Sequence, residues 1–150
     1  LGCLWETMDG DKGVVQALGN AFGALDRPPY VFLDGDDRSG TATGGENLIV
    51  NLDRLAQIRR VLVFAYIYEG VPNWAAADGV VTMYPVGAAP DRDPSRRGRQ
   101  RQALLCDRDA HQHGGGDLRI DREVRYISGT QRNVDEAYGW GGMNWTAARK

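Results

Sequence analysis

The segment from Asp34 to Glu46 gathers oxygen-bearing side chains: it holds four carboxylates, two threonines and one serine, with four glycines among them. Carboxylate, hydroxyl and carbonyl oxygens are the ligands of hard cations, and a protein-bound calcium ion takes about six to eight of them. Glycine residues allow the backbone to turn so that carbonyl oxygens point inward. The composition therefore predicts a loop that can wrap a cation such as calcium.

The spacing of these acids does not match an EF-hand. If Asp34 and Asp36 are the first and third ligands, Arg38 takes the fifth position and Gly45 the twelfth, where an EF-hand needs a bidentate glutamate. The alternative interpretation is an acidic hairpin loop, rich in turn-forming residues, that binds no ion. Both interpretations stay open at this point.

Short strands must position this loop, because the runs at 30–33 and 47–52 predict a hairpin around it. The run at 58–69 is apolar enough to be buried on both faces in the middle of a sheet. Residues 14–22 fit either a short helix or an irregular strand, and a helical turn is possible at 74–77. The other expected strands are 1–5, 79–84, 118–127 and 138–145. This pattern predicts a single all-β domain over residues 1–150, an antiparallel β-sandwich with short helical turns.

The overall composition fits one domain, since a chain of 150 residues buries about 68–70% of the surface that its unfolded form exposes. A net charge of −2 and a pI near 5.7 give no overall attraction to nucleic acid or to anionic membranes. Cys3 and Cys106 are too few for a disulfide framework, which favours a reducing cytoplasm and leaves one bridge as the alternative. The longest apolar run, 61–68, is too short to span a membrane. Because the chain begins at Leu1 inside an expected strand, we expect further residues upstream.

Four segments of the chain resemble the TerD-like tellurium-resistance and bacterial stress proteins: 1–6, 35–52, 67–69 and 138–145. The second segment is the most specific, because the calcium loop of that family reads Gly-Asp-Asn-x-Thr-Gly, followed by an acidic cluster and an alternating strand. The resemblance implies a calcium-binding β-sandwich associated with tellurite, phage and general stress resistance. It also implies no catalytic activity, and partners among other stress and tellurium-resistance proteins.

The resemblance also carries a set of candidate ligands. Asp36, Asp37 and Glu46 fall on acidic or amide positions of the family loop, and Ser39 falls on its threonine. Asp34 matches no acid of the family pattern and is an additional candidate. Two carboxylates of the family cluster are missing, and a second acidic segment of the family corresponds to residues 16–20, which contain no acid. Fewer anionic ligands lower calcium affinity. We therefore expect weak calcium binding, binding at a single site, or no calcium binding.

Residues 91–113 differ from the pattern around them, because they contain six arginines and both histidines of the chain. One interpretation is an anion-binding or nucleic-acid-binding arm, but no aromatic residue is present for base stacking. A second is a metal cluster of Cys106, Asp107, His111 and His113, which lacks a recognised zinc spacing. A solvated loop is the ordinary alternative. A further hypothesis is a frame-shifted segment, since a one-nucleotide shift with suitable codons yields an alternating strand, a turn and an apolar strand.

The remaining residues favour a non-enzymatic protein. Outside 91–113 the chain has no histidine and, apart from Cys3, no cysteine, so it offers no Ser/His or Cys/His pair. Asp36 and Asp37 lie in an open glycine-rich loop that gives no obvious desolvation for acid–base catalysis, so cation binding is the simpler use of these carboxylates. The prediction is a cytoplasmic bacterial stress protein that binds calcium. The alternative is a calcium-independent interaction module that keeps the same fold with a degenerate ion site.

Overall fold

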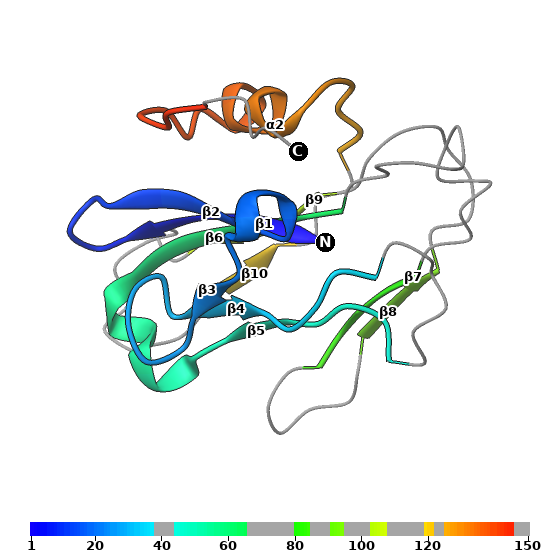
Figure 1. Ribbon diagram of the computed structural model, residues 1–150, viewed down its shortest axis with the longest axis horizontal. Helices are drawn as coiled ribbons and strands as arrows, with labels where there is room; N and C mark the ends of the chain where they lie inside the picture. Colours follow the sequence, from blue (N-terminus) through cyan, green and yellow to red (C-terminus); the bar gives the residue numbers. More distant parts are fainter. Residues whose placement is uncertain are drawn as a thin grey trace.

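The computed structural model describes residues 1–37, 44–65, 80–84, 91–94, 103–107, 119–121 and 125–145. Most of these residues lie in antiparallel sheets or in the turns between strands, and the described part contains one α-helix. Figure 1 shows three layers in which α2 lies on one side of the larger sheet and strands β3 to β5 lie on the other. The prediction of a β-rich antiparallel fold is therefore confirmed.

The larger sheet has five strands in the order β10-β9-β6-β1-β2. The central strand β6 pairs with β1 and β9, which confirms the prediction of a mid-sheet strand over its described part. Its side chains alternate between two apolar clusters, with Val61 in one and Leu62 in the other, as expected for a strand buried on both faces. The strands are β1 (Gly2–Thr7), β2 (Lys12–Gln16), β6 (Ile58–Phe64), β9 (Ala103–Asp107) and β10 (Arg119–Asp121).

A smaller sheet of three strands carries the acidic loop. It consists of β3 (Gly23–Ala24), β4 (Val31–Leu33) and β5 (Leu48–Val50) in that order, which confirms the predicted hairpin on either side of the loop. This sheet packs against the larger one through one apolar cluster, and β7 (Val80–Met83) pairs with β8 (Asp91–Pro94) in a separate ribbon. The buried members of the cluster are Cys3, Val15, Tyr30, Val31, Leu33, Ile58 and Val61.

The predicted final strand at 138–145 is wrong. Helix α2 (Gln131–Tyr138) ends at the first residue of this region, with a capping box at Thr130 and a left-handed Gly139 at its C-terminus. Gly141 and Gly142 also have positive φ angles, which a strand does not accommodate. The helix and the glycine-rich segment after it pack on the second face of the larger sheet, where the buried residues are Leu4, Leu62, Phe64, Val134 and Trp140.

The structure also refines the predictions for two other segments, 118–127 and 14–22. The strand predicted at 118–127 is present at Arg119–Asp121, and residues 125–127 lie outside any strand. The ambiguous segment 14–22 completes β2 and then forms the 3-10 helix η1 (Leu18–Asn20), while η2 (Leu52–Gln57) follows β5. The possible helical turn at 74–77 lies outside the described residues. No helix in the described ranges is long and apolar enough to cross a bilayer.

The arginine-rich segment 91–113 contains both β8 and β9 as the sequence is printed. In β9, Leu105 lies opposite Leu62 and Asp107 lies opposite Arg60, so the register matches apolar with apolar and acid with base. The frame-shift hypothesis stays a prediction. Cys3 on β1 lies opposite Val63 of β6, and Cys106 on β9 lies opposite Val61, so the two cysteines are more than two strand spacings apart, that is, more than about 9.6 Å. That distance is too long for a disulfide.

Candidate functional site

Asp34 closes the neck of the acidic loop. It follows β4 directly, and its two carboxylate oxygens accept hydrogen bonds from the backbone N–H and the side-chain amide of Asn47, both at 2.7 Å. These bonds, the backbone one above all, hold the pKa of the Asp34 carboxyl below its ordinary value of 3.8. Asp34 is therefore ionised at neutral pH and ties the end of β4 to the start of β5.

Glu46 brings the two described ends of the loop together. Its Oε1 accepts a hydrogen bond from the backbone N–H of Asp37 at 2.8 Å, and its Oε2 forms an ion pair with the amino group of Leu1 at 2.5 Å. Asp36 is exposed, while Asp37 and Glu46 are half-buried. Four of the five candidate ligands are thus placed at the loop, and the fifth, Ser39, lies outside the described residues.

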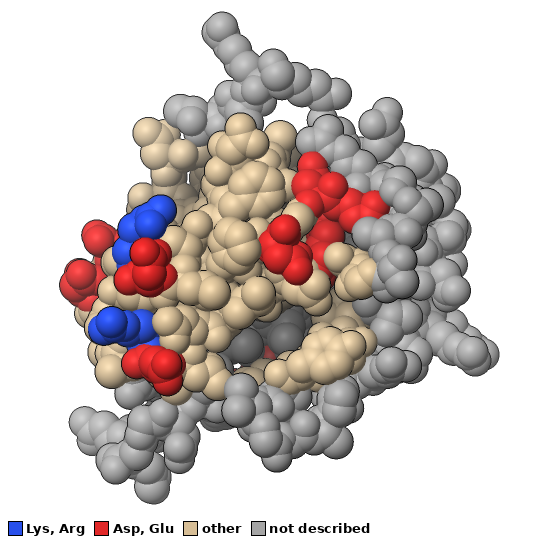
Figure 2. Space-filling model, turned by 60° about the horizontal axis from the view of Figure 1, so that its bottom comes forward, with Lys and Arg blue, Asp and Glu red and all other residues tan. Residues whose placement is uncertain are grey.

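The chemistry of these donors fits a hard cation. A carboxylate has about four lone-pair positions, so Asp34 and Glu46 keep acceptor capacity beyond their N–H partners. Figure 2 shows acidic side chains gathered on one part of the surface with no lysine or arginine among the coloured residues between them. Among the residues that the structure describes, no three acids, histidines or cysteines are close enough to form a metal cage. A complete calcium site would therefore need further oxygens, for which Ser39 is a candidate.

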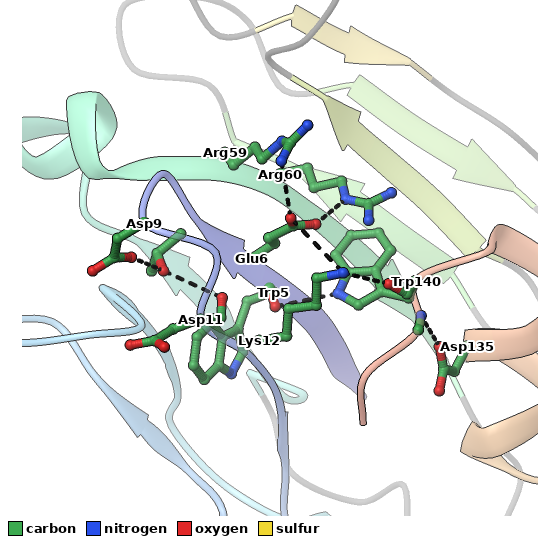
Figure 3. A network of polar contacts seen from close by, with 11 residues as sticks. Trp5, Glu6, Asp9, Asp11, Lys12, Arg59, Arg60, Asp135 and Trp140 are labelled. Carbon is green, nitrogen blue, oxygen red and sulfur yellow. Dashed lines mark hydrogen bonds and ion pairs between the residues drawn. The ribbon is translucent and has the colours of Figure 1, made fainter. Parts of the chain in front are cut away.

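A second polar cluster surrounds Glu6 on the larger sheet (Figure 3). Glu6 is 3% exposed, and its carboxylate pairs with Arg60 Nε at 2.6 Å, with Arg59 at 3.2 Å and with Lys12 Nζ at 3.9 Å. A buried carboxylate is stable only when cations or hydrogen-bond donors compensate for its lost hydration. The three cations supply this compensation, so the cluster stabilises the sheet rather than leaving a free acid for catalysis.

The same cluster holds the C-terminal segment on the sheet. The Arg60 guanidinium lies 3.9 Å from the centre of the Trp140 ring, and Lys12 Nζ donates to the Trp140 carbonyl at 2.6 Å. Trp140 Nε1 donates to the carbonyl of Trp5 at 3.3 Å. Asp135 on α2 fixes the turn that follows, because its carboxylate accepts from the Gly141 N–H and from Trp145 Nε1. Trp140 is buried.

The strand register places charged residues at paired positions across all five strands. Reading from β2 to β10, the paired positions are Lys12, Glu6, Arg60, Asp107 and Arg119. For Lys12, Glu6 and Arg60, whose side chains the structure describes, opposite charges at directly paired positions stabilise the antiparallel strands. This row of paired charges was not identified from the sequence. A local pattern could have indicated it, because in β1 and β6 a charged residue lies two positions from a leucine, which places both side chains on one face of the sheet.

Asp9 and Asp11 lie in a turn between β1 and β2. The backbone N–H of Thr7 donates to the Asp11 carbonyl, and Gly10 donates to the carbonyl of Thr7. The Thr7 hydroxyl donates to the Asp9 carboxylate, and this bond is the main reason why the pKa of Asp9 lies below its ordinary value. The aspartates of this turn therefore serve local structure.

Comparison with known proteins identifies a relative that matches the whole chain. The chain is 41% identical over 150 residues to a tellurium resistance protein TerA from an Alcaligenes species. The chain is related to the TerD-like tellurium-resistance proteins. The matched region is the whole of this chain and 43% of the length of that TerA relative. No family model matches the chain. No solved structure matches it. The resemblance found in the acidic loop and in the glycine- and tryptophan-rich C-terminal segment is confirmed at the level of this family.

Proposed function

We propose that this protein is a non-enzymatic, calcium-binding stress-response protein of the tellurium-resistance type, whose two packed sheets are the halves of a β-sandwich. The proposal places it in the bacterial cytoplasm, where it acts through other tellurium-resistance proteins. The observation that carries the calcium assignment is the closure of the loop by Glu46, which brings the backbone of Asp37 to its carboxylate. Calcium ligands come from such short segments, in which carboxylates converge from both ends of one loop.

Two further observations support the calcium assignment. Asp34 is held ionised at the neck of the loop by Asn47, which keeps a negative charge at the site at neutral pH. Asp36, the acid next to the Glu46–Asp37 contact, is exposed to solvent and accessible to an ion. With few carboxylates, affinity in the range of about 10⁻⁴ to 10⁻³ M is the expectation for such a site.

The second candidate function is a calcium-independent interaction module. It is favoured by the partners of the loop carboxylates, because Asp34 accepts from Asn47, and Glu46 accepts from the Asp37 N–H. These contacts hold both ends of the loop without a cation. In this case the loop would keep its shape after the ion site has been lost.

Thermal unfolding with millimolar calcium, compared with a chelator and with magnesium, distinguishes the two functions. A ligand that binds the folded protein raises its melting temperature by mass action, so calcium binding predicts a calcium-specific rise of a few degrees. Asp36→Ala should remove the rise, whereas Asp26→Ala, which removes another exposed aspartate, should keep it. No rise, or an equal rise with magnesium, would reject the calcium function and leave the interaction module.

A further inference from the structure

Strand β5 forms one border of the smaller sheet. Within the described ranges it pairs with β4 on one side, and no described strand pairs with its other side. Strand edges carry backbone N–H and C=O groups that can pair with another extended chain. The edge of β5 is therefore a candidate surface for strand addition.

The hydrogen bonds at both ends of the hairpin show which backbone groups point outward. Asn51 N donates to the Tyr30 carbonyl, and Asp34 N donates to the Asn47 carbonyl. The register pairs Phe32 with Ile49 midway between these two bonds. Because hydrogen-bonded and non-bonded pairs alternate in an antiparallel ladder, Ile49 bonds to β4. The N–H and C=O groups of Leu48 and Val50 then face the open edge.

The side chains around this edge are apolar and acidic. Ile49 is 41% exposed and Leu52, which follows the strand, is 44% exposed. The loop at the other end of the strand carries Asp34 and Asp36 at its exposed positions. Figure 2 brings forward the lower side of the molecule in Figure 1 and shows the acidic gathering beside an uncharged area. Among the coloured residues of this face, lysines and arginines lie apart from it and are mixed with acids.

We propose that the open edge of β5 binds an extended, basic segment of a partner protein by strand addition. Main-chain hydrogen bonds to Leu48 and Val50 would supply the pairing, and apolar side chains of the partner would cover Ile49. Lysine or arginine residues at one end of the segment would lie near the acidic loop, where opposite charge favours association. The segment thus alternates apolar residues with basic ones.

A second copy of this chain is the less suitable occupant. Edge-to-edge pairing of two β5 strands about a two-fold axis would be antiparallel, and β5 (Leu48–Val50) carries no basic residue to meet the acidic loop of the other copy. The acidic surroundings of the edge thus favour a basic partner over a second copy. This inference does not depend on calcium binding, so its test is carried out in chelator.

The test uses a synthetic heptapeptide of alternating lysine and valine with the whole chain, and measures binding by fluorescence anisotropy. A glutamate–valine peptide controls for charge, and a fully N-methylated lysine–valine peptide controls for backbone pairing. Binding of the lysine peptide alone is expected. Asp36→Lys should weaken binding of the lysine peptide by about tenfold at low salt, because it changes the charge beside the bound peptide by two units. Glu136→Lys makes the same charge change on the exposed side of α2 and should leave binding unchanged.

Hydrogen exchange of single amides, followed by NMR, gives the decisive pattern. Bound peptide should protect the amides of Leu48 and Val50, whose N–H groups face the edge, more than that of Ile49, whose N–H already bonds to β4. Equal binding of the N-methylated peptide, or no added protection at Leu48 and Val50, would overturn the proposal. Dimerisation of the free protein with the same protection pattern would also overturn it, because the occupant would then be a second copy.

Discussion

The carboxylates of this protein occupy two contrasting environments. Glu6 is buried on the larger sheet and meets Lys12, Arg59 and Arg60, whereas Asp34 is exposed and meets the amide groups of Asn47. The difference follows from hydration, because a buried charge needs a counter-charge and an exposed one remains solvated. The buried acid is therefore part of the framework, while the exposed acids are the ones available to an ion or a partner.

The first test of this contrast removes the Trp140 ring, which lies against the Arg60 guanidinium of the buried cluster. Trp140 is 1% exposed and contacts both Arg60 and the apolar cluster under α2. Trp140→Ala should lower the free energy of unfolding by about 4 kcal/mol, because it leaves a large cavity and uncovers the charges. Urea unfolding measures the change.

The matched control for this variant is Trp5→Ala, which removes a half-buried tryptophan from the opposite face of the same sheet. Trp5→Ala should cost less, because part of its ring is already in water. If Trp140→Ala cost no more than Trp5→Ala, the C-terminal segment would not be a fixed part of the fold, and the cluster would not hold it.

The second test removes the buried charge. Glu6→Gln leaves Arg60 and Lys12 without their shared anion and should cost about 3 kcal/mol, as for other broken buried ion pairs. A double-mutant cycle with Arg60→Met isolates the pair, since residues in direct contact show non-additive effects. Urea unfolding of the four proteins supplies the coupling free energy.

The exposed pair Arg132–Glu136 on α2 is the reference for this cycle. Its side chains are 68% and 56% exposed, so a coupling of about 0.3–0.5 kcal/mol is expected there. A Glu6–Arg60 coupling as small as that of the exposed pair would contradict the framework role assigned to Glu6.

The sheets could be predicted from the sequence because their signals are local. The apolar run at 58–69 predicts a central strand, and the acidic loop between the runs at 30–33 and 47–52 predicts a hairpin. The acidic loop could also be found, because its residues are neighbours in the chain. The arginine partners of Glu6 could not be found in this way, since Arg59 and Arg60 lie far from it in sequence and meet it only through strand register.

The C-terminal helix was missed for a different physical reason. Its eight residues, Gln131–Tyr138, are too few to be stable alone, and the tryptophans and glycines that follow them have strand or turn preferences. Packing of Val134 and Trp140 on the sheet overrides these preferences. The capping box at Thr130 and Asn133 and the glycine at 139 were the local signals that could have identified the helix.

The smallest expected effect concerns Asp34 in the exposed region. Its pKa is lowered in the folded protein, mainly by the backbone hydrogen bond from Asn47, so its ionised form stabilises the fold at pH values above the unfolded pKa. This contribution is lost as the pH falls through the folded value, below 3.8. Asp34→Asn should therefore melt slightly below the unmodified protein at pH 7, and the difference should shrink as the pH falls below 3.8 through the folded pKa, as scanning calorimetry would show. A difference in melting temperature that stayed constant with pH would mean that the hydrogen bonds, rather than the charge, close the loop. In that case the loop would not hold the ionised carboxylate that a cation or a basic partner needs.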